Sequence, residues 1–274
     1  MAKITAQMVK SLRERTGLPM MECKQALSEN DGEIEAAKAW LQKRHKGKMA
    51  DRAGKATGEG RIAVCINGGV GGIVELQCET APVAKNELFV ALADAFAEAA
   101  ARSDSATPDP DALRNAPELD AKFTEAFGQL REAMKLTRAR RVAGTYLTSY
   151  VHHDGKSGVL IALDAVPSSD NIGPDLCMHA TFARPIAIDR DGVPEDQVER
   201  VRSQAREIAE SEGKKPEIIE KIVAGKVNAF FGERTLMEQL HARSDVYGKK
   251  KIRDVLASAG VGAVTDLAFM KIGG

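Results

Sequence analysis

The chain has 274 residues and carries 39 Lys and Arg residues against 39 Asp and Glu residues, so its formal net charge is zero. At about 150 residues per domain, this length predicts about two domains. A neutral chain has no overall electrostatic attraction to nucleic acid or to an anionic membrane, and an aromatic content of 4% argues against base-stacking platforms. The apolar fraction of 43% is that of an ordinary globular protein and excludes wholesale disorder.

The sequence shows neither a membrane-span pattern nor an export signal. The richest apolar stretch, residues 88–101, is interrupted by Asp94 and Glu98, and the N-terminal residues lack the apolar run of a signal peptide. The cysteines lie far apart without a CxxC pair, which favours reduced thiols over a disulfide framework or a zinc site: Cys23, Cys65, Cys78 and Cys177. We therefore expect a soluble cytoplasmic protein with no direct nucleic-acid partner and no membrane partner.

Residues 1–46 have the pattern of a small helical module. We expect Thr5 to cap the first helix, Gly17 to end it, Pro19 to open the second helix and Asp31 to cap the third. Three short helices form only a marginal core. The module is therefore expected to need a partner or a neighbouring domain.

A basic stretch follows this module. Residues 38–55 contain seven Lys and Arg residues and one acid. The stretch fits an exposed helix end followed by a linker at residues 47–60, and it also fits a local contact with an acidic partner surface or RNA.

Two segments of mixed helix and strand come next. Residues 62–66 and 74–78 alternate in polarity around a glycine-rich turn, which predicts a β-hairpin, and helices are expected at 88–99 and along the apolar stripe 119–134. A second strand pair is expected at 141–151 and 158–165, followed by a helix through Leu176 and Ala180. The repeated order predicts an α+β fold with two related core subdomains, a weak internal duplication. We place these subdomains at 61–140 and at 141–193 together with 232–274.

The second subdomain is interrupted by a charged helical segment. Residues 194–231 are helical in pattern with a break at Gly213 and Pro216, which predicts an antiparallel helical hairpin that stands off the body. Its aliphatic seam offers a possible site of homodimer formation. A helix at 249–258 and a strand towards Ile272 are expected to close the chain.

Catalytic motifs are not recognisable in the sequence. The glycine-rich turn at 68–72 is followed by neither Gly-Lys-Ser/Thr nor a helix, as a phosphate-binding loop would be. His152 and His153 are neighbours on a predicted strand, so their side chains are expected on opposite faces and unable to share one metal ion. His179 is expected to lie in the core or at its rim. We expect no enzymatic activity, no cofactor and no metal.

Two segments carry more specific information. Residues 12–27 read LRERTGLPMMECKQAL, and residues 75–86 read ELQCETAPVAKN. The first resembles the signature L-R-x-x-T-G-x-x-x-M-x-C-K-x-A-L of the elongation factor Ts (EF-Ts) family. Weaker motifs of that family follow in its order at 140–142, 149–152, 178–179, 184–185 and 213–216.

The resemblance extends along nearly the whole chain and implies both a fold and a function. The fold would comprise a ubiquitin-associated-like helical module, two α+β core subdomains with antiparallel sheets and a protruding helical hairpin. The function would be guanine-nucleotide exchange on the elongation factor EF-Tu, in its GDP-bound and nucleotide-free forms. The resemblance implies EF-Tu contacts at Arg13, Met20, Met21 and His152, although methionines at helical spacing also fit a core.

The second segment departs from the family pattern. EF-Ts proteins carry Thr-Asp-Phe-Val-Ala-(Lys/Arg)-Asn where residues 80–86 read TAPVAKN. The resemblance implies that Thr80, Ala81, Pro82 and Val83 lie near the magnesium and phosphate site of the partner. Ala81 lacks a carboxylate, and Pro82 lacks both an aromatic ring and a backbone donor, so the chemistry of the Asp-Phe pair does not carry over.

Two alternatives therefore remain beside an EF-Ts-like exchange factor. One is an EF-Ts-like protein that binds EF-Tu with weak or no exchange activity, because Ala81 and Pro82 replace the Asp-Phe pair. The other is an adaptor whose helical module binds a different protein.

Overall fold

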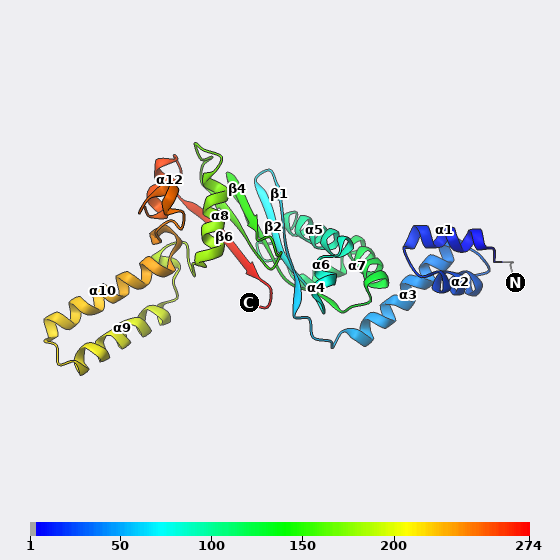
Figure 1. Cartoon of the computed structure of the whole chain (residues 1–274), viewed down its shortest axis with the longest axis horizontal. Coiled ribbons are helices and arrows are strands. Elements are labelled where there is room, and N and C mark those ends of the chain that lie inside the picture. The colour runs from blue at the N-terminus through cyan, green and yellow to red at the C-terminus, as the bar shows by residue number, and fades with distance from the viewer. Residues whose placement is uncertain (1–3) are drawn as a thin grey trace.

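The computed structural model describes residues 4–274; residues 1–3, which begin the expected helical module, lie outside the described residues. Figure 1 shows an elongated molecule with a helical module at one end, two sheets flanked by helices in the middle and a helical hairpin at the other end. This arrangement of helices and small antiparallel sheets confirms the expected α+β class.

The N-terminal module consists of α1 (Ala6–Thr16), α2 (Met20–Glu29) and α3 (Ile34–Arg52). Thr5 caps α1 by accepting a hydrogen bond from the Met8 amide (3.3 Å), and Gly17, in the left-handed conformation (φ 65°), ends it as expected. Asp31 does not cap α3, because it lies in the preceding turn with a φ of 49° and Glu33 occupies the cap position.

The helix α3 is longer than the sequence pattern indicated. It crosses the boundary expected at residue 46 and ends at Arg52, so six residues of the expected linker are helical. Met49, in this extension, packs against the core of the first sheet. Most of the basic stretch therefore lies on a helix that reaches from the module to the body. Trp40, also on α3, is partly buried against the module's own core, with the Arg44 guanidinium 5.1 Å from its ring centre.

The first sheet has the strand order β1 (Glu59–Asn67), β2 (Val70–Cys78) and β3 (Met134–Ala143), all antiparallel. The strands β1 and β2 form the expected hairpin. Strand β3 differs from expectation, because its residues were expected to end a helix at Met134 and to begin the next strand at Arg141. Leu136 and Ala139 are buried on the same face although they are three positions apart, because a bulge opposite Glu75 and Leu76 interrupts the alternation of the strand; Val142 is buried on the other face, between the sheets. That spacing imitates a helix in the sequence.

The second sheet repeats this plan with β4 (Tyr146–Val151), β5 (Ser157–Leu163) and β6 (Val264–Lys271) in that order. The two sheets pack face to face through an aliphatic layer formed by Ile62, Ile73, Val142, Leu147, Leu160, Ala162, Ala268 and Met270. Helices cover the outer faces: α5 (Glu87–Ala101), α6 (Pro110–Asn115) and α7 (Pro117–Leu130) lie over the first sheet, and α8 (Ile172–Ala183) and α12 (Ile252–Ser258) over the second.

The helical hairpin consists of α9 (Glu195–Ser211) and α10 (Pro216–Arg234), three residues longer than expected at its end. Its buried seam is formed by Ala205, Ala209, Ile219 and Val223. Short elements connect it to the second sheet: η1 (Arg190–Gly192), η2 (Leu236–Glu238) and α11 (Ser244–Tyr247). The helix expected at 249–258 begins only at Ile252, after the bridge between Leu240 and Lys251.

Gly72 allows α5 to lie unusually close to β2. A Cβ atom at Gly72 would be 2.1 Å from the Ala97 carbonyl oxygen, which is part of the α5 backbone and cannot move alone. Gly72→Ala is expected to lower the free energy of unfolding by about 2 kcal/mol or more, measured by urea denaturation. Gly225→Ala is the matched control, because nothing lies within 4 Å of that position in α10. It should raise stability by up to about 1 kcal/mol; an equal effect of the two substitutions would contradict this explanation.

Candidate functional site

The segment Thr80–Val83 forms a short, fixed turn at the surface. It directly follows β2, and α4 (Ala81–Ala84) closes through a hydrogen bond from the Ala84 amide to the Thr80 carbonyl oxygen (3.2 Å). The Glu132 carboxylate accepts hydrogen bonds from the Thr80 amide (3.0 Å) and from its hydroxyl (2.6 Å). Pro82 is exposed, whereas Ala81 and Val83 are half-buried. The segment can therefore offer a partner an apolar surface of defined shape, with no ionisable side chain.

Glu79, which directly precedes this segment, attaches it to α3 and to the chain after α7. Glu79 accepts a hydrogen bond from the Ala133 amide (2.6 Å), and its two carboxylate oxygens accept from Arg52 Nη2 (2.8 and 2.9 Å). These two donors hold the pKa of the Glu79 carboxyl below its usual range. Burial raises the pKa of the Cys78 thiol to about 12, so this cysteine has a structural role and is not a nucleophile.

His152 lies in the turn between β4 and β5. Its Nδ1 is 3.0 Å from the Tyr150 hydroxyl, and its ring centre is 4.2 Å from that of His153. The expectation that the two imidazoles point to opposite faces is wrong, because β4 ends at Val151 and the alternation of a strand does not extend into the turn. No group of three His, Cys, Asp or Glu side chains within residues 4–274 is arranged to hold a metal ion.

The turn that carries His152 and the segment Thr80–Val83 lie at the same end of the paired sheets. The Ile62 amide donates to the Gly155 carbonyl oxygen (2.8 Å), and Lys156 forms an ion pair with Glu59 (2.7 Å). Glu59 in turn pairs with Cys78, two residues before Thr80. The fold thus places two of the predicted contact regions at one end of the body, although 70 positions separate them in sequence.

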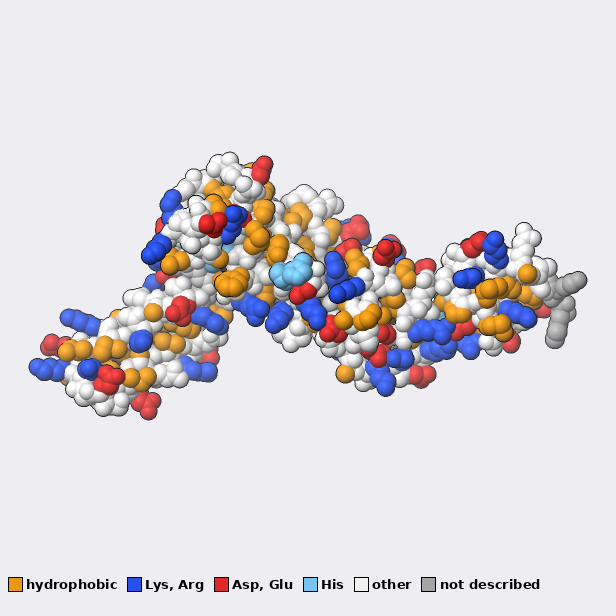
Figure 2. Space-filling view, viewed as in Figure 1, with side chains coloured by type: hydrophobic (Ala, Val, Ile, Leu, Met, Phe, Trp, Pro, Cys, Tyr) orange, Lys and Arg blue, Asp and Glu red, His pale blue; other side chains and the backbone are white. Residues whose placement is uncertain are grey.

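The third predicted region is on the helical module. Met20 and Met21 are 49% and 73% exposed at the start of α2, and Arg13 is exposed in the last turn of α1. The side chains that the same motif sends inward, Cys23 and Leu27, form the module's core. Figure 2 shows hydrophobic side chains at the surface of this end of the molecule.

His179, in contrast, belongs to the core of the second subdomain. Its Nε2 is 2.9 Å from the Gln239 side-chain oxygen, and its Nδ1 accepts a hydrogen bond from the Ala242 amide (3.1 Å). Burial lowers its pKa, which favours the neutral imidazole.

Sequence reasoning missed several residues that shape these surfaces. Glu132 and Arg52 support the segment from 52 and 27 positions away, and no local pattern marks either of them. Phe182, on α8, is the most exposed large hydrophobic side chain among the described residues.

The fold and these surfaces define a modular α+β protein whose predicted contact residues lie on open faces of separate modules. No helix within residues 4–274 is long and apolar enough to cross a membrane. The chain belongs to the elongation factor Ts family: the family model described as Elongation factor TS matches residues 79–274.

Curated relatives support the same assignment over almost the entire chain. Elongation factor Ts from Kineococcus radiotolerans is 38% identical over 283 aligned positions, with complete coverage of both chains. The Nitrobacter hamburgensis protein is 37% identical and covers 94% of this chain and 87% of its own length. The Sphingopyxis alaskensis protein is also 37% identical, with coverage of 97% and 91%.

Proposed function

We propose that the chain is a guanine-nucleotide exchange factor that binds EF-Tu·GDP and promotes GDP release without covalent chemistry. Family membership supports EF-Tu as the partner. The observation that carries the proposal is the fixed, exposed segment Thr80–Val83, which occupies the place of the family's Asp-Phe pair. No cofactor is required, because an exchange factor makes and breaks no bonds.

The proposed mechanism is a linkage between two binding equilibria. A factor that binds nucleotide-free EF-Tu more tightly than EF-Tu·GDP must weaken GDP binding by the same ratio. Each tenfold loss of GDP affinity needs about 1.4 kcal/mol of differential contact. Several factors of ten therefore require a broad interface, which the three separated contact regions supply.

Each region has a proposed part in that interface. The module docks through Arg13, Met20 and Met21, and the turn at His152 holds a further surface of EF-Tu. The segment Thr80–Val83 presses on the nucleotide domain near its magnesium and phosphate site. Because Ala81 and Pro82 replace the Asp-Phe pair, the segment acts by its shape alone. The alternative is that the chain binds EF-Tu but promotes GDP release only weakly.

Restoring the family residues tests this role of the segment. A buried aromatic ring and a charge-assisted hydrogen bond together contribute about 3–5 kcal/mol, or about two to three factors of ten in rate if expressed fully in the transition state. Ala81→Asp combined with Pro82→Phe is therefore expected to accelerate release of a fluorescent GDP analogue from EF-Tu at fixed magnesium. Ala81→Asn with Pro82→Leu is the matched control, because it adds side chains without the charge or the ring. If the native chain already releases GDP rapidly and the double substitution leaves that rate unchanged, Ala81 and Pro82 do not limit exchange and this prediction is wrong.

The methionine pair tests docking by the helical module. Met20→Ala with Met21→Ala is expected to raise the dissociation constant for EF-Tu about tenfold, since exposed anchors of this size carry about 1 kcal/mol or more at a protein interface. The fold should be unaffected, because both side chains are exposed. Val166→Ala removes a comparably exposed apolar group from a loop and serves as the control. If titration calorimetry shows undiminished affinity for EF-Tu, the module is not part of the interface.

We propose further that the α9–α10 hairpin mediates self-association and takes no part in exchange. Ile208 and Ile218, close to its tip, are 59% and 46% exposed beyond the buried seam. Replacing both with Ser is expected to shift the chain towards a monomer in sedimentation equilibrium and to leave the GDP-release rate within about twofold of the native value. Loss of exchange by this folded variant would place the hairpin in the EF-Tu interface instead.

A further inference from the structure

Three consecutive residues after α7 contact both the helical module and the exposed segment. The first, Arg131, ends α7 in the left-handed conformation (φ 58°), with its amide bonded to the Phe127 carbonyl oxygen (2.8 Å). This conformation turns the chain sharply, so that residues 131, 132 and 133 leave the helix in different directions. We call residues 131–133 the junction turn.

Arg131 reaches the helical module. Its Nη2 donates to Glu22 Oε1 at 2.8 Å, and the same carboxylate lies 3.6 Å from Lys48 Nζ and 3.4 Å from His45 Nε2. The Glu22 side chain is only 16% exposed. Burial alone would raise its pKa, but the cationic and hydrogen-bonding neighbours outweigh burial and lower it. Glu22 belongs to the same motif as Met20 and Met21, the two exposed residues that directly precede it.

The next two residues reach the exposed segment. Glu132 binds the amide and the hydroxyl of Thr80, and the Ala133 amide donates to Glu79. Arg131 and Glu132 are adjacent, so the tether of the module and the tether of the segment are covalently joined.

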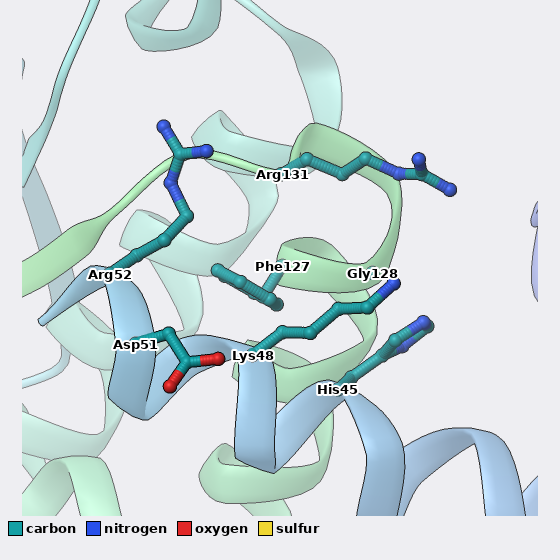
Figure 3. A pocket seen from close by; sticks show the side chains of 7 residues that line it. All are labelled: His45, Lys48, Asp51, Arg52, Phe127, Gly128 and Arg131. Carbon is teal, nitrogen blue, oxygen red and sulfur yellow. The ribbon is translucent and has the colours of Figure 1, made fainter.

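A second connection runs along α3. His45, in the middle of this helix, contacts Glu22, and Arg52, at its end, binds Glu79. His45 also packs closely on α7, since a Cβ atom at Gly128 would lie 2.5 Å from His45 Nδ1. Beside this contact an open pocket of about 270 Å³ lies between α3 and α7; it is lined by His45, Lys48, Asp51, Arg52, Phe127, Gly128 and Arg131. Figure 3 shows Phe127 between the two helices, with Arg52 and Arg131 on separate backbones at the rim. Polar contacts at both ends of this pocket therefore add to the packing of His45 on Gly128 in fixing the angle between the module and the body.

We infer that the junction turn positions the helical module and the segment Thr80–Val83 relative to each other, with Arg131 and Glu132 as the two positioning residues. This inference rests on the proposed function, because it makes the two regions one preformed surface for EF-Tu. A module that moved freely would have to be immobilised on binding, and that loss of freedom would weaken the complex. Arg131 thus governs affinity, and Glu132 governs the effect of the segment on bound GDP.

The position of the module can be measured without EF-Tu. Spin labels on Lys24→Cys and Lys85→Cys, in a chain with Cys65→Ser, report the distance between two exposed sites on α2 and beside α4. Arg131→Ala is expected to broaden this distance distribution, whereas Arg131→Lys keeps the cation and most of the order. Lys122→Ala, which removes another ion pair from α7, is the matched control and should leave the distribution narrow. An equally narrow distribution with Arg131→Ala would overturn the inference.

Unlabelled Arg131→Ala and Glu132→Gln variants separate the affinity for EF-Tu from the rate of GDP release. Arg131→Ala should raise the dissociation constant for EF-Tu about three- to tenfold and leave the GDP-release rate at saturating factor unchanged. Glu132→Gln should lower that saturating rate about threefold with little change in affinity. Circular dichroism spectra establish that each variant is folded. A uniform loss of both quantities in either variant would indicate a purely structural role and would overturn the inference. Failure of the native chain to release GDP would overturn the proposed function alone, because the distance measurement does not involve EF-Tu.

Discussion

The aliphatic contact between the two sheets is the constraint on which the rest of the molecule depends. Leu160 and Ile73 in this layer are fully buried, because the inner face of each sheet is covered by that of the other. Because the sheets are locked face to face, the ends of their hairpins are locked as well. The turn with His152 and the segment Thr80–Val83 therefore occupy fixed positions at one end of the body without a direct contact between them.

The helical module is attached by a different kind of interaction. Its own core is small, and its polar contacts with α7 and the residue that ends it are the Glu22–Arg131 and Lys46–Asp120 ion pairs and a hydrogen bond from Gln129 to the Thr16 carbonyl oxygen (3.0 Å), beside the packing of His45 on Gly128. Half-exposed ion pairs are individually weak and directional, whereas the buried layer between the sheets is strong and insensitive to small rotations. The body is thus a rigid frame, and the module's orientation depends on a few side chains.

Sequence patterns predicted those features that depend on neighbouring residues. The cap at Thr5, the helix end at Gly17, the first hairpin and the two long helices near the break at Gly213 all follow from local signals, and the motif at residues 12–27 indicated the family. Strand β3 was missed because its bulge converts the spacing of buried side chains from two to three. Glu132 was missed for another reason, since its partner Thr80 is 52 positions away and only the fold brings them together. Whether Arg13, Met20, Met21 and His152 contact EF-Tu stays a prediction.

The single tryptophan gives this modular construction a practical consequence. Trp40 lies on α3, packed against the module's core, and the other modules contain no tryptophan. Intrinsic indole emission of the free protein therefore originates at one end of an elongated molecule, next to the arginine that stacks on its ring. Unfolding curves recorded by tryptophan fluorescence describe the module, whereas far-ultraviolet ellipticity averages over all helices. Any separation between the two curves is then a direct optical readout of how independently the module melts from the paired sheets.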